Sequence, residues 1–196
     1  LNEVKCRPFK RAVQTVSYFP HFISLVVVCG MLTEFCLSDG LFNQIRALFG
    51  LSPKPLLQDP LLFRTIYVSS GVWQTVGWSS IVYLAAIAGI DQGLYEAAAL
   101  DGAGRWRCMW HITLPGLKQT VVVLLIMQIG KMMNVSADKI ILLYNNSTME
   151  TADVISSYVY RRGLKNNDYS FGAAVDLFNS LVNVIILCSA NYFSKH

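Results

Sequence analysis

Long apolar segments alternate with polar connectors along the chain, and this pattern predicts a helical membrane protein. A helix needs about 20 mainly apolar residues to cross a bilayer. Four segments approach or exceed this length, at residues 17–37, 65–90, 116–133 and 169–193. The second has no charged residue, whereas Lys118 and Lys131 shorten the uncharged core of the third to residues 119–130. We therefore expect an all-α membrane protein whose single domain, residues 1–196, has four spans.

The first and third connectors contain helical patterns of their own. Between residues 38 and 63, apolar residues recur at helical spacing from Leu41 to Phe49, which predicts a short amphipathic helix in the membrane interface. Between residues 134 and 168, Ser147 and Glu150 have the spacing of a capping box. The helix that they open is expected to end near Arg162–Gly163.

The second connector, residues 91–115, predicts two short helices joined by a sharp turn. Residues 94–100 are good helix formers, and three consecutive alanines give them a smooth face. Asp101–Gly102 predicts a turn, because glycine tolerates positive φ. A second helical stretch follows at residues 105–111, and Pro115 suits the first turn of the next helix. We expect an elbow whose alanine surface another protein can approach closely.

Composition supports the membrane interpretation and excludes several other functions. The 196 residues are 54% hydrophobic and 14% charged, against about 25% charged in soluble domains. The net charge of +4 is small, and no basic run is interleaved with aromatic residues, so nucleic-acid binding is not expected. The three histidines are far apart, the five cysteines are scattered, and no nucleophile or phosphate-loop motif is present. We expect no catalytic residue, metal, cofactor or structural disulfide in this chain.

The order of residues in the second connector follows a long motif: Glu-Ala-Ala, three residues, Gly, nine residues, then Ile-x-Leu-Pro. The matching positions are Glu96, Ala97, Ala98, Gly102, Ile112, Leu114 and Pro115. This pattern resembles the EAA loop of permease subunits of ABC importers, and Asp101 before the glycine is typical of their sugar branch. The resemblance extends to residues 3–24, 73–90 and 152–163, which are similar to permeases for complex carbohydrates such as rhamnogalacturonan fragments or alginate.

The resemblance implies the transmembrane domain of a type I ABC importer. Such permeases have six spans, so this chain is expected to be a fragment with spans three to six. Residues 96–102 would form a coupling helix that docks on a cytoplasmic ATPase dimer, which binds the ATP. Further implied partners are a second homologous permease subunit, an extracytoplasmic solute-binding protein, the lipid bilayer and a carbohydrate, in particular an oligosaccharide. The implied location is the bacterial cytoplasmic membrane, with several membrane passes.

The orientation of the elbow rests on this resemblance, in which the EAA loop is cytoplasmic. Four predicted spans place eight basic residues on each side of the membrane, so the positive-inside rule does not decide between the two orientations. The first flank alone, with Lys5, Arg7, Lys10 and Arg11, favours the cytoplasmic side.

Two polar stripes on predicted spans are candidates for the substrate pathway. Asp176, Asn179 and Asn183 share one face of the last span, and Gln74 and Trp78 share one face of the second. Polar groups inside a membrane usually face a water-filled path or the interior of a helix bundle. The alternative roles are hydrogen bonds between helices and, for tryptophan, anchoring at the interface.

Two other functions are compatible with the sequence. One is an ABC permease for a solute that is not a sugar. The other is a secondary carrier that uses Asp176 for ion coupling; it would transport under an ion gradient without an ATPase partner.

Overall fold

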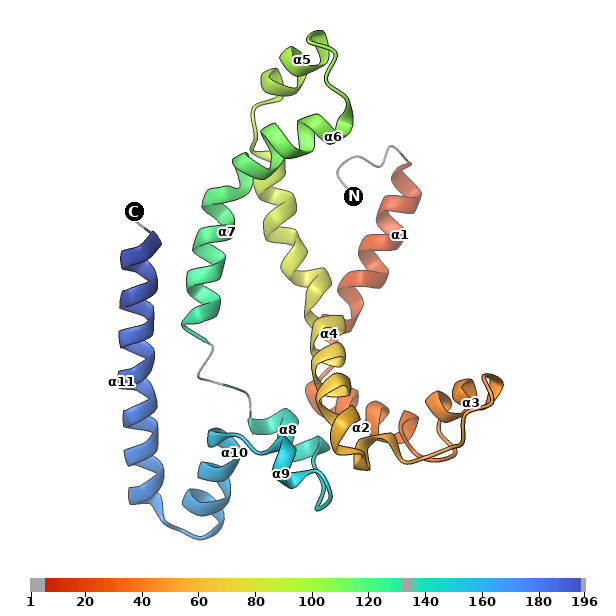
Figure 1. Cartoon of the computed structure of the whole chain (residues 1–196), viewed down its shortest axis with the longest axis vertical. Coiled ribbons are helices and arrows are strands. Elements are labelled where there is room, and N and C mark those ends of the chain that lie inside the picture. Colours follow the sequence, from red (N-terminus) through yellow and green to blue (C-terminus); the bar gives the residue numbers. More distant parts are fainter. Residues whose placement is uncertain (1–5, 132–134, 136, 195–196) are drawn as a thin grey trace.

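Helices and connecting turns make up the computed structural model, which describes residues 6–131, 135 and 137–194 (Figure 1). These ranges contain no β-strand, so the prediction of an all-α chain is confirmed for them. The N-terminal part contains α1 (Arg7–Tyr18), η1 (Phe19–Phe22), α2 (Leu25–Phe35), α3 (Leu41–Leu48), η2 (Leu56–Gln58) and α4 (Pro60–Ala88). The remainder contains α5 (Gln92–Leu100), α6 (Arg105–Cys108), η3 (Met109–Thr113), α7 (Leu114–Ile129), α8 (Ala137–Leu143), α9 (Met149–Ala152), α10 (Ile155–Val159), η4 (Tyr160–Lys165) and α11 (Tyr169–Ser194).

The 29-residue helix α4 is the axis of the molecule (Figure 1). It begins at Pro60, where the missing N–H costs nothing, and the Asp59 side chain accepts a hydrogen bond from the Leu61 N–H at 3.0 Å. At 1.5 Å per residue the helix is about 43 Å long, enough to cross a bilayer. The hydroxyls of Ser70, Thr75 and Ser80 donate to carbonyls of the same helix, so these polar groups have partners within α4.

Two helical runs of the described chain combine the length and the apolar composition of a membrane span. They are Arg105–Ile129 and Tyr169–Tyr192, which overlap the third and fourth predicted spans. The bent pair Arg7–Phe22 and Leu25–Phe35 adds a third if the two helices form one span. α4 covers most of the second predicted span and is long enough, but it is less apolar than these runs. The four predicted spans stay a prediction, and residues 132–133 of the third lie outside the described ranges.

The first predicted span, residues 17–37, differs from a single straight helix. The helices on either side of residues 23–24 meet at 99°. Pro20 removes one backbone donor just before the break, and Ile23 and Ser24 are extended. The Ser24 hydroxyl then accepts a hydrogen bond from the Val27 N–H at 3.4 Å, which caps the start of α2.

The amphipathic helix predicted in the first connector is present as α3. Its buried side holds Asn43, whose side-chain amide donates to the carbonyls of Leu37 and Lys54 at 2.7 Å each. The Asn43 side-chain oxygen accepts from the Lys54 N–H at 3.1 Å. Leu41, Ile45 and other apolar residues of α3 remain exposed. Asn43 thus ties the helix to both of its flanks, and much of its apolar surface stays exposed.

The helix predicted to open at Ser147 and Glu150 is interrupted. α9 ends at Ala152, and Asp153 and Val154 are extended before α10 begins. The Val154 N–H donates to the Ser157 hydroxyl at 3.0 Å. That hydroxyl in turn donates to the Asp153 carboxylate, which also accepts from Arg161 at 2.9 Å. These bonds start a new helix, and the π-helical turn η4 carries the chain past the predicted end.

Replacing Asp153 by asparagine is expected to destabilise the protein at neutral pH and to have less effect in acid. Hydrogen bonds from Arg161 lower the pKa of Asp153. A carboxylate whose pKa falls on folding stabilises the fold above its unfolded pKa of about 3.9 and loses that contribution as the pH falls through the folded pKa. We expect a loss of about 1–3 kcal/mol at neutral pH. Thermal melts of wild type and variant in detergent would measure it, and a difference that grows on acidification would contradict this assignment.

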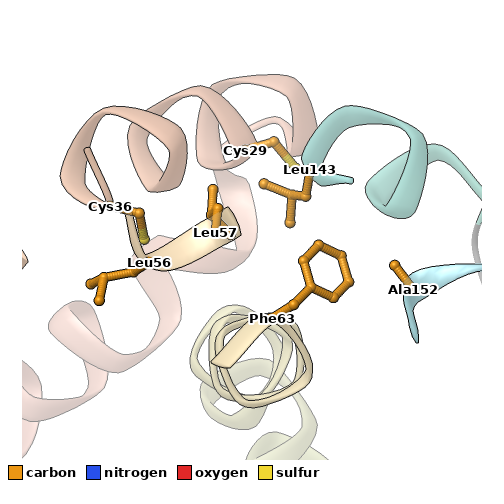
Figure 2. Close-up of a cluster of buried hydrophobic side chains, with 7 residues drawn as sticks. All are labelled: Cys29, Cys36, Leu56, Leu57, Phe63, Leu143 and Ala152. Carbon is orange, nitrogen blue, oxygen red and sulfur yellow. The ribbon is translucent and has the colours of Figure 1, made fainter. Parts of the chain in front are cut away.

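A small core lies at the end of α4 opposite the elbow (Figure 2). It comprises Cys29, Cys36, Leu56, Leu57, Phe63, Leu143 and Ala152, which come from α2, the loop after it, η2, α4, α8 and α9. Outside this core the chain is open: it exposes 13807 Å², whereas a compact monomer of this mass exposes about 9,300 Å². The chain therefore exposes far more surface than a compact monomer of its mass.

Candidate functional site

The elbow between α4 and α7 projects from one end of the molecule, and its first part is α5 (Figure 1). The Asp91 side chain caps α5 by accepting a hydrogen bond from the Gly93 N–H at 2.9 Å. Glu96 and Ala97 are exposed along the helix, whereas Ala98 is half-buried against the rest of the elbow.

The turn that ends α5 is built on Gly102, which has a φ of +73°. The Gly102 N–H donates to the Ala99 carbonyl at 3.1 Å, and the Ala103 N–H donates to the Ala98 carbonyl at 2.9 Å. This pair of bonds is a Schellman motif, in which glycine is favoured because the left-handed conformation has no Cβ penalty. Asp101 and Gly102 are both exposed at its tip. The predicted glycine turn is confirmed.

The second half of the elbow differs from the predicted pair of helices. α6, η3 and α7 form one helical run, Arg105–Ile129, and η3 is a π-helical turn inside it. Pro115 explains the wider turn, because its ring would clash with the carbonyl four residues earlier in a regular α-helix. The Thr113 hydroxyl lies 3.5 Å from the Cys108 carbonyl and donates to it, and a ring nitrogen of His111 lies 3.1 Å from the Arg107 carbonyl. Two side chains of the wider turn thus contact carbonyls of the preceding helical turn.

The two halves of the elbow are braced by a hydrogen bond between the hydroxyls of Tyr95 and Thr113, 2.9 Å apart. Ala98 and Ile112 both line a hollow of about 260 Å³ between the halves, so the structure brings these two motif residues together. Leu114 and Pro115 are exposed at the start of α7. No sequence signal predicts the brace, because its partners are 18 residues apart.

Large apolar side chains are exposed on the outside of the elbow. Leu100 is 90% exposed at the end of α5, and Trp106 and Trp110 are also exposed on the following helix. Clusters of this kind mark surfaces that contact another protein or a membrane. Helical spacing predicted the helices that carry these residues, but their exposure depends on how the elbow folds back on itself.

The two pathway candidates on α4, Gln74 and Trp78, contact the break in the first predicted span. The Gln74 side-chain amide donates to the Ile23 carbonyl at 3.1 Å. The Trp78 ring stacks on His21, with a centroid distance of 4.6 Å and an interplanar angle of 6°. Both residues are thus engaged with the chain itself.

Of the three candidates on α11, Asn183 lies beside the end of α7. The Asn183 amide donates to the Gly130 carbonyl at 2.6 Å, whereas Asp176 is exposed. The side-chain oxygens of Asn179 and Asn183 are buried and have no hydrogen-bond partner among the described residues. The stripes on α4 and α11 therefore contact different elements, and a shared lining of a sugar pathway stays a prediction.

No group of three His, Cys, Asp or Glu side chains with the arrangement of a metal site occurs in the described part of the chain.

Comparison with known families and curated proteins gives clear relatives. The family described as "Binding-protein-dependent transport system inner membrane component" matches residues 5–195. The polygalacturonan/rhamnogalacturonan transport system permease protein YteP of Bacillus subtilis (strain 168) is 42% identical over 100% of this chain and 61% of its own length. Protein LplB of the same organism is 40% identical over 100% of this chain and 62% of its own length. The chain thus spans about three fifths of these relatives.

Solved structures agree with the sequence relatives. A crystal structure of a bacterial ABC transporter involved in the import of the acidic polysaccharide alginate matches with a TM-score of 0.96 and 44% identity. The match covers 99% of this chain and 68% of that one. A bacterial alginate ABC transporter in complex with an alginate pentasaccharide-bound periplasmic protein matches over the same shares, with a TM-score of 0.95 and 44% identity.

Proposed function

Because the chain belongs to the family of binding-protein-dependent transport system inner membrane components, we propose that it is a permease subunit of an ATP-driven importer. It contributes one half of a pathway across the bacterial cytoplasmic membrane, and a second homologous permease contributes the other. A dimer of cytoplasmic ATPase subunits binds and hydrolyses the ATP, so this chain holds no cofactor and catalyses no reaction of its own.

The observation that carries the proposal is the geometry of the elbow. α5 presents Glu96 and Ala97 on an exposed, thin helical surface, and the cap at Asp91 and the turn at Gly102 fix both of its ends. A small side chain allows the backbone of a partner to come close, and Glu96 offers a carboxylate to an arginine or lysine of the ATPase. The brace between Tyr95 and Thr113 ties α5 to the helix that continues into α7.

The elbow is suited to act as a lever. α4 enters it and α7 leaves it, so a displacement of α5 moves the adjoining ends of both long helices together. Movement of the ATPases towards each other would then shift the helices between inward-open and outward-open arrangements. The coupling helix of the proposal comprises residues 96–102, and Ile112 supports it from within the elbow.

The proposed cargo is a carbohydrate, in particular an oligosaccharide. Support comes from YteP, whose name specifies polygalacturonan/rhamnogalacturonan, and from the transporter of the acidic polysaccharide alginate. The alginate transporter is also seen with a periplasmic protein that carries the sugar, which supports an extracytoplasmic solute-binding protein as a partner. Asp176, Asn179, Asn183, Gln74 and Trp78 remain the candidates for contact with the sugar.

A cysteine at Leu100 is expected to crosslink to the ATPase subunit, whereas a cysteine at Leu48 is not. The two leucines are 90% and 84% exposed, but they lie at opposite ends of α4, in the elbow and in α3 (Figure 1). The full-length permease would be assembled with its ATPase in membrane vesicles and treated with a short bifunctional reagent. Failure of Leu100→Cys in every nucleotide state, or equal crosslinking at both sites, would sink the docking proposal. Transport driven by an ion gradient in the absence of the ATPase would favour the secondary carrier instead.

A further inference from the structure

One face of α4 contacts the chain around the break in the first predicted span. Gln74, Gly77 and Trp78 occupy positions i, i+3 and i+4, so they lie on one face of the helix. Gln74 and Trp78 contact the bent segment that joins α1 to α2, and Gly77 contacts Ser17 near the end of α1. The contacted residues lie before, within and after the short helix η1.

Gln74 donates a hydrogen bond to the Ile23 carbonyl, which has no helical donor because the helix is broken there. Ile23 is extended and lies between η1 and α2. Its carbonyl accepts the hydrogen bond from the Gln74 amide at 3.1 Å. Backbone polar groups that are removed from water need such a partner, and α4 supplies it from 51 residues away.

Gly77 allows the closest approach between α1 and α4. A Cβ at this position would lie 1.9 Å from the Ser17 carbonyl oxygen and 2.4 Å from the Ser17 carbonyl carbon. Neither atom belongs to a side chain that could move aside. The absence of a side chain at Gly77 therefore sets the distance between the two helices.

Trp78 forms a cluster of three aromatic rings with His21 and Phe22. His21 stacks on the indole at 4.6 Å, and Phe22 meets the indole edge-on at 5.8 Å with an interplanar angle of 86°. His21 and Phe22 also meet edge-on, at 5.7 Å. Edge-on and offset aromatic contacts favour one geometry over others, so the cluster orients η1 relative to α4.

We propose that Gln74, Gly77 and Trp78 form a latch through which α4 holds the bend and carries movement of the elbow to α2. This inference rests on the proposed function of the elbow. α4 ends at Ala88 and reaches the elbow through two residues, Gly89 and Ile90, before the cap of α5. Beyond the break, α2 packs against α8 and belongs to the core in Figure 2. The three residues are positioning residues: they act through the backbone of the bent span.

The latch is needed because the bend itself is weakly defined. Only Ile23 and Ser24 separate η1 from α2, and both have ordinary extended backbone. Nothing in those two residues fixes the angle of 99°. α4 also meets α2 in the core, through Phe63. The contacts of Gln74, Gly77 and Trp78 join α4 to the bend itself, nearer the elbow.

The experiment compares Gln74→Met with Thr75→Val in the full-length permease assembled with its ATPase. Methionine keeps the length of Gln74 and removes the donor. Thr75 is the next residue of α4, is exposed, and directs its hydroxyl to the Gly71 carbonyl of its own helix at 2.8 Å. Spin labels on the exposed residues Val16 of α1 and Val26 of α2 report the bend, in a background without the exposed cysteines Cys6 and Cys188.

For wild type and Thr75→Val we expect the distance between the labels to change when ATP and vanadate trap the ATPases. For Gln74→Met we expect the ratio of molecules with the changed distance to molecules with the original distance to fall by about fivefold or more, the lower end of the range for coupling between two sites, while ATP hydrolysis continues. The labels are read without sugar, so loss of a sugar contact alone would leave the distance change intact. Equal changes in Gln74→Met and Thr75→Val would overturn the latch.

A second variant guards against misfolding of the first. His21→Leu removes the ring that stacks on Trp78 and keeps an apolar side chain, and it is expected to reduce the distance change in the same direction. A full-sized change in His21→Leu together with a misfolded Gln74→Met would also overturn the proposal. Failure of the elbow proposal looks different: the wild type itself would show no distance change on trapping, and Leu100→Cys would not crosslink.

Discussion

Replacing Gly102 by valine is expected to uncouple transport from ATP hydrolysis while the long helices stay folded. Gly102 has a φ of +73°, and a β-branched residue in this conformation costs about 1–3 kcal/mol. A Cβ at Gly102 meets nothing within 4 Å, so the cost falls on the turn and not on packing elsewhere. The turn would relax and lose the bonds to Ala98 and Ala99 that end α5. We expect uptake per ATP hydrolysed to fall about tenfold or more, within the range of coupling free energies between sites.

The chain offers matched controls for this change. Gly104 is two residues away and has a φ of −74°, and a Cβ there also meets nothing within 4 Å, so Gly104→Val keeps an allowed conformation. Gly50, at the end of α3, has a φ of +71°, so Gly50→Val introduces the same strain far from the elbow. Gly102→Asn is expected to be milder, because asparagine tolerates the left-handed region. Uptake measured in proteoliposomes decides: wild-type coupling in Gly102→Val, or equal losses in Gly50→Val, would refute the role of the turn.

Replacing Gly77 by alanine is expected to have the largest effect on folding. The added methyl group would lie 1.9 Å from the Ser17 carbonyl oxygen, so α1 and α4 have to separate. Separation breaks the hydrogen bond from Gln74 and the stack between Trp78 and His21. Overpacking against backbone costs about 3 kcal/mol or more, a large part of the stability of an ordinary domain. We expect little protein to be recovered as a monodisperse species in detergent.

The same substitution at Gly30 serves as the control for Gly77→Ala. Gly30 lies inside α2, and a Cβ there meets nothing within 4 Å. Gly30→Ala is therefore expected to stabilise the helix by about 0.5–1 kcal/mol. Size-exclusion profiles and melting temperatures of the two variants would be compared. Similar behaviour of both would show that the contact between Gly77 and Ser17 is less tight than the structure indicates.

Three parts of the elbow illustrate how far the sequence predicts the candidate site. The turn at Asp101–Gly102 was predictable because a glycine after a helix former signals a left-handed residue, and that signal is local. The π-helical turn before Pro115 was not predicted: proline indicated a helix start, and both a start and a widened turn relieve the same clash. The brace between Tyr95 and Thr113 was also missed, since hydroxyl residues at a distance of 18 positions carry no pairing signal.

For the pathway candidates, the sequence predicted the polar residues but not their hydrogen-bond partners. Polar side chains at helical spacing singled out Gln74 and Asn183. Their observed partners are backbone carbonyls of Ile23 and Gly130, 51 and 53 residues away. Every residue has the same backbone carbonyl. The sequence therefore does not indicate which carbonyl will accept a hydrogen bond from a given side-chain amide.

The sequence by itself determined that the chain is helical, where the elbow turns and which family the chain belongs to. Each of these follows from residues that are close along the chain: apolar runs, the pair Asp101–Gly102 and the motif of residues 96–115. Only the tertiary structure decided the 99° bend, the latch on α4 and the outward direction of Leu100. These features depend on which distant segments pack together, and packing is set by the free energy of the whole arrangement and not by any local stretch.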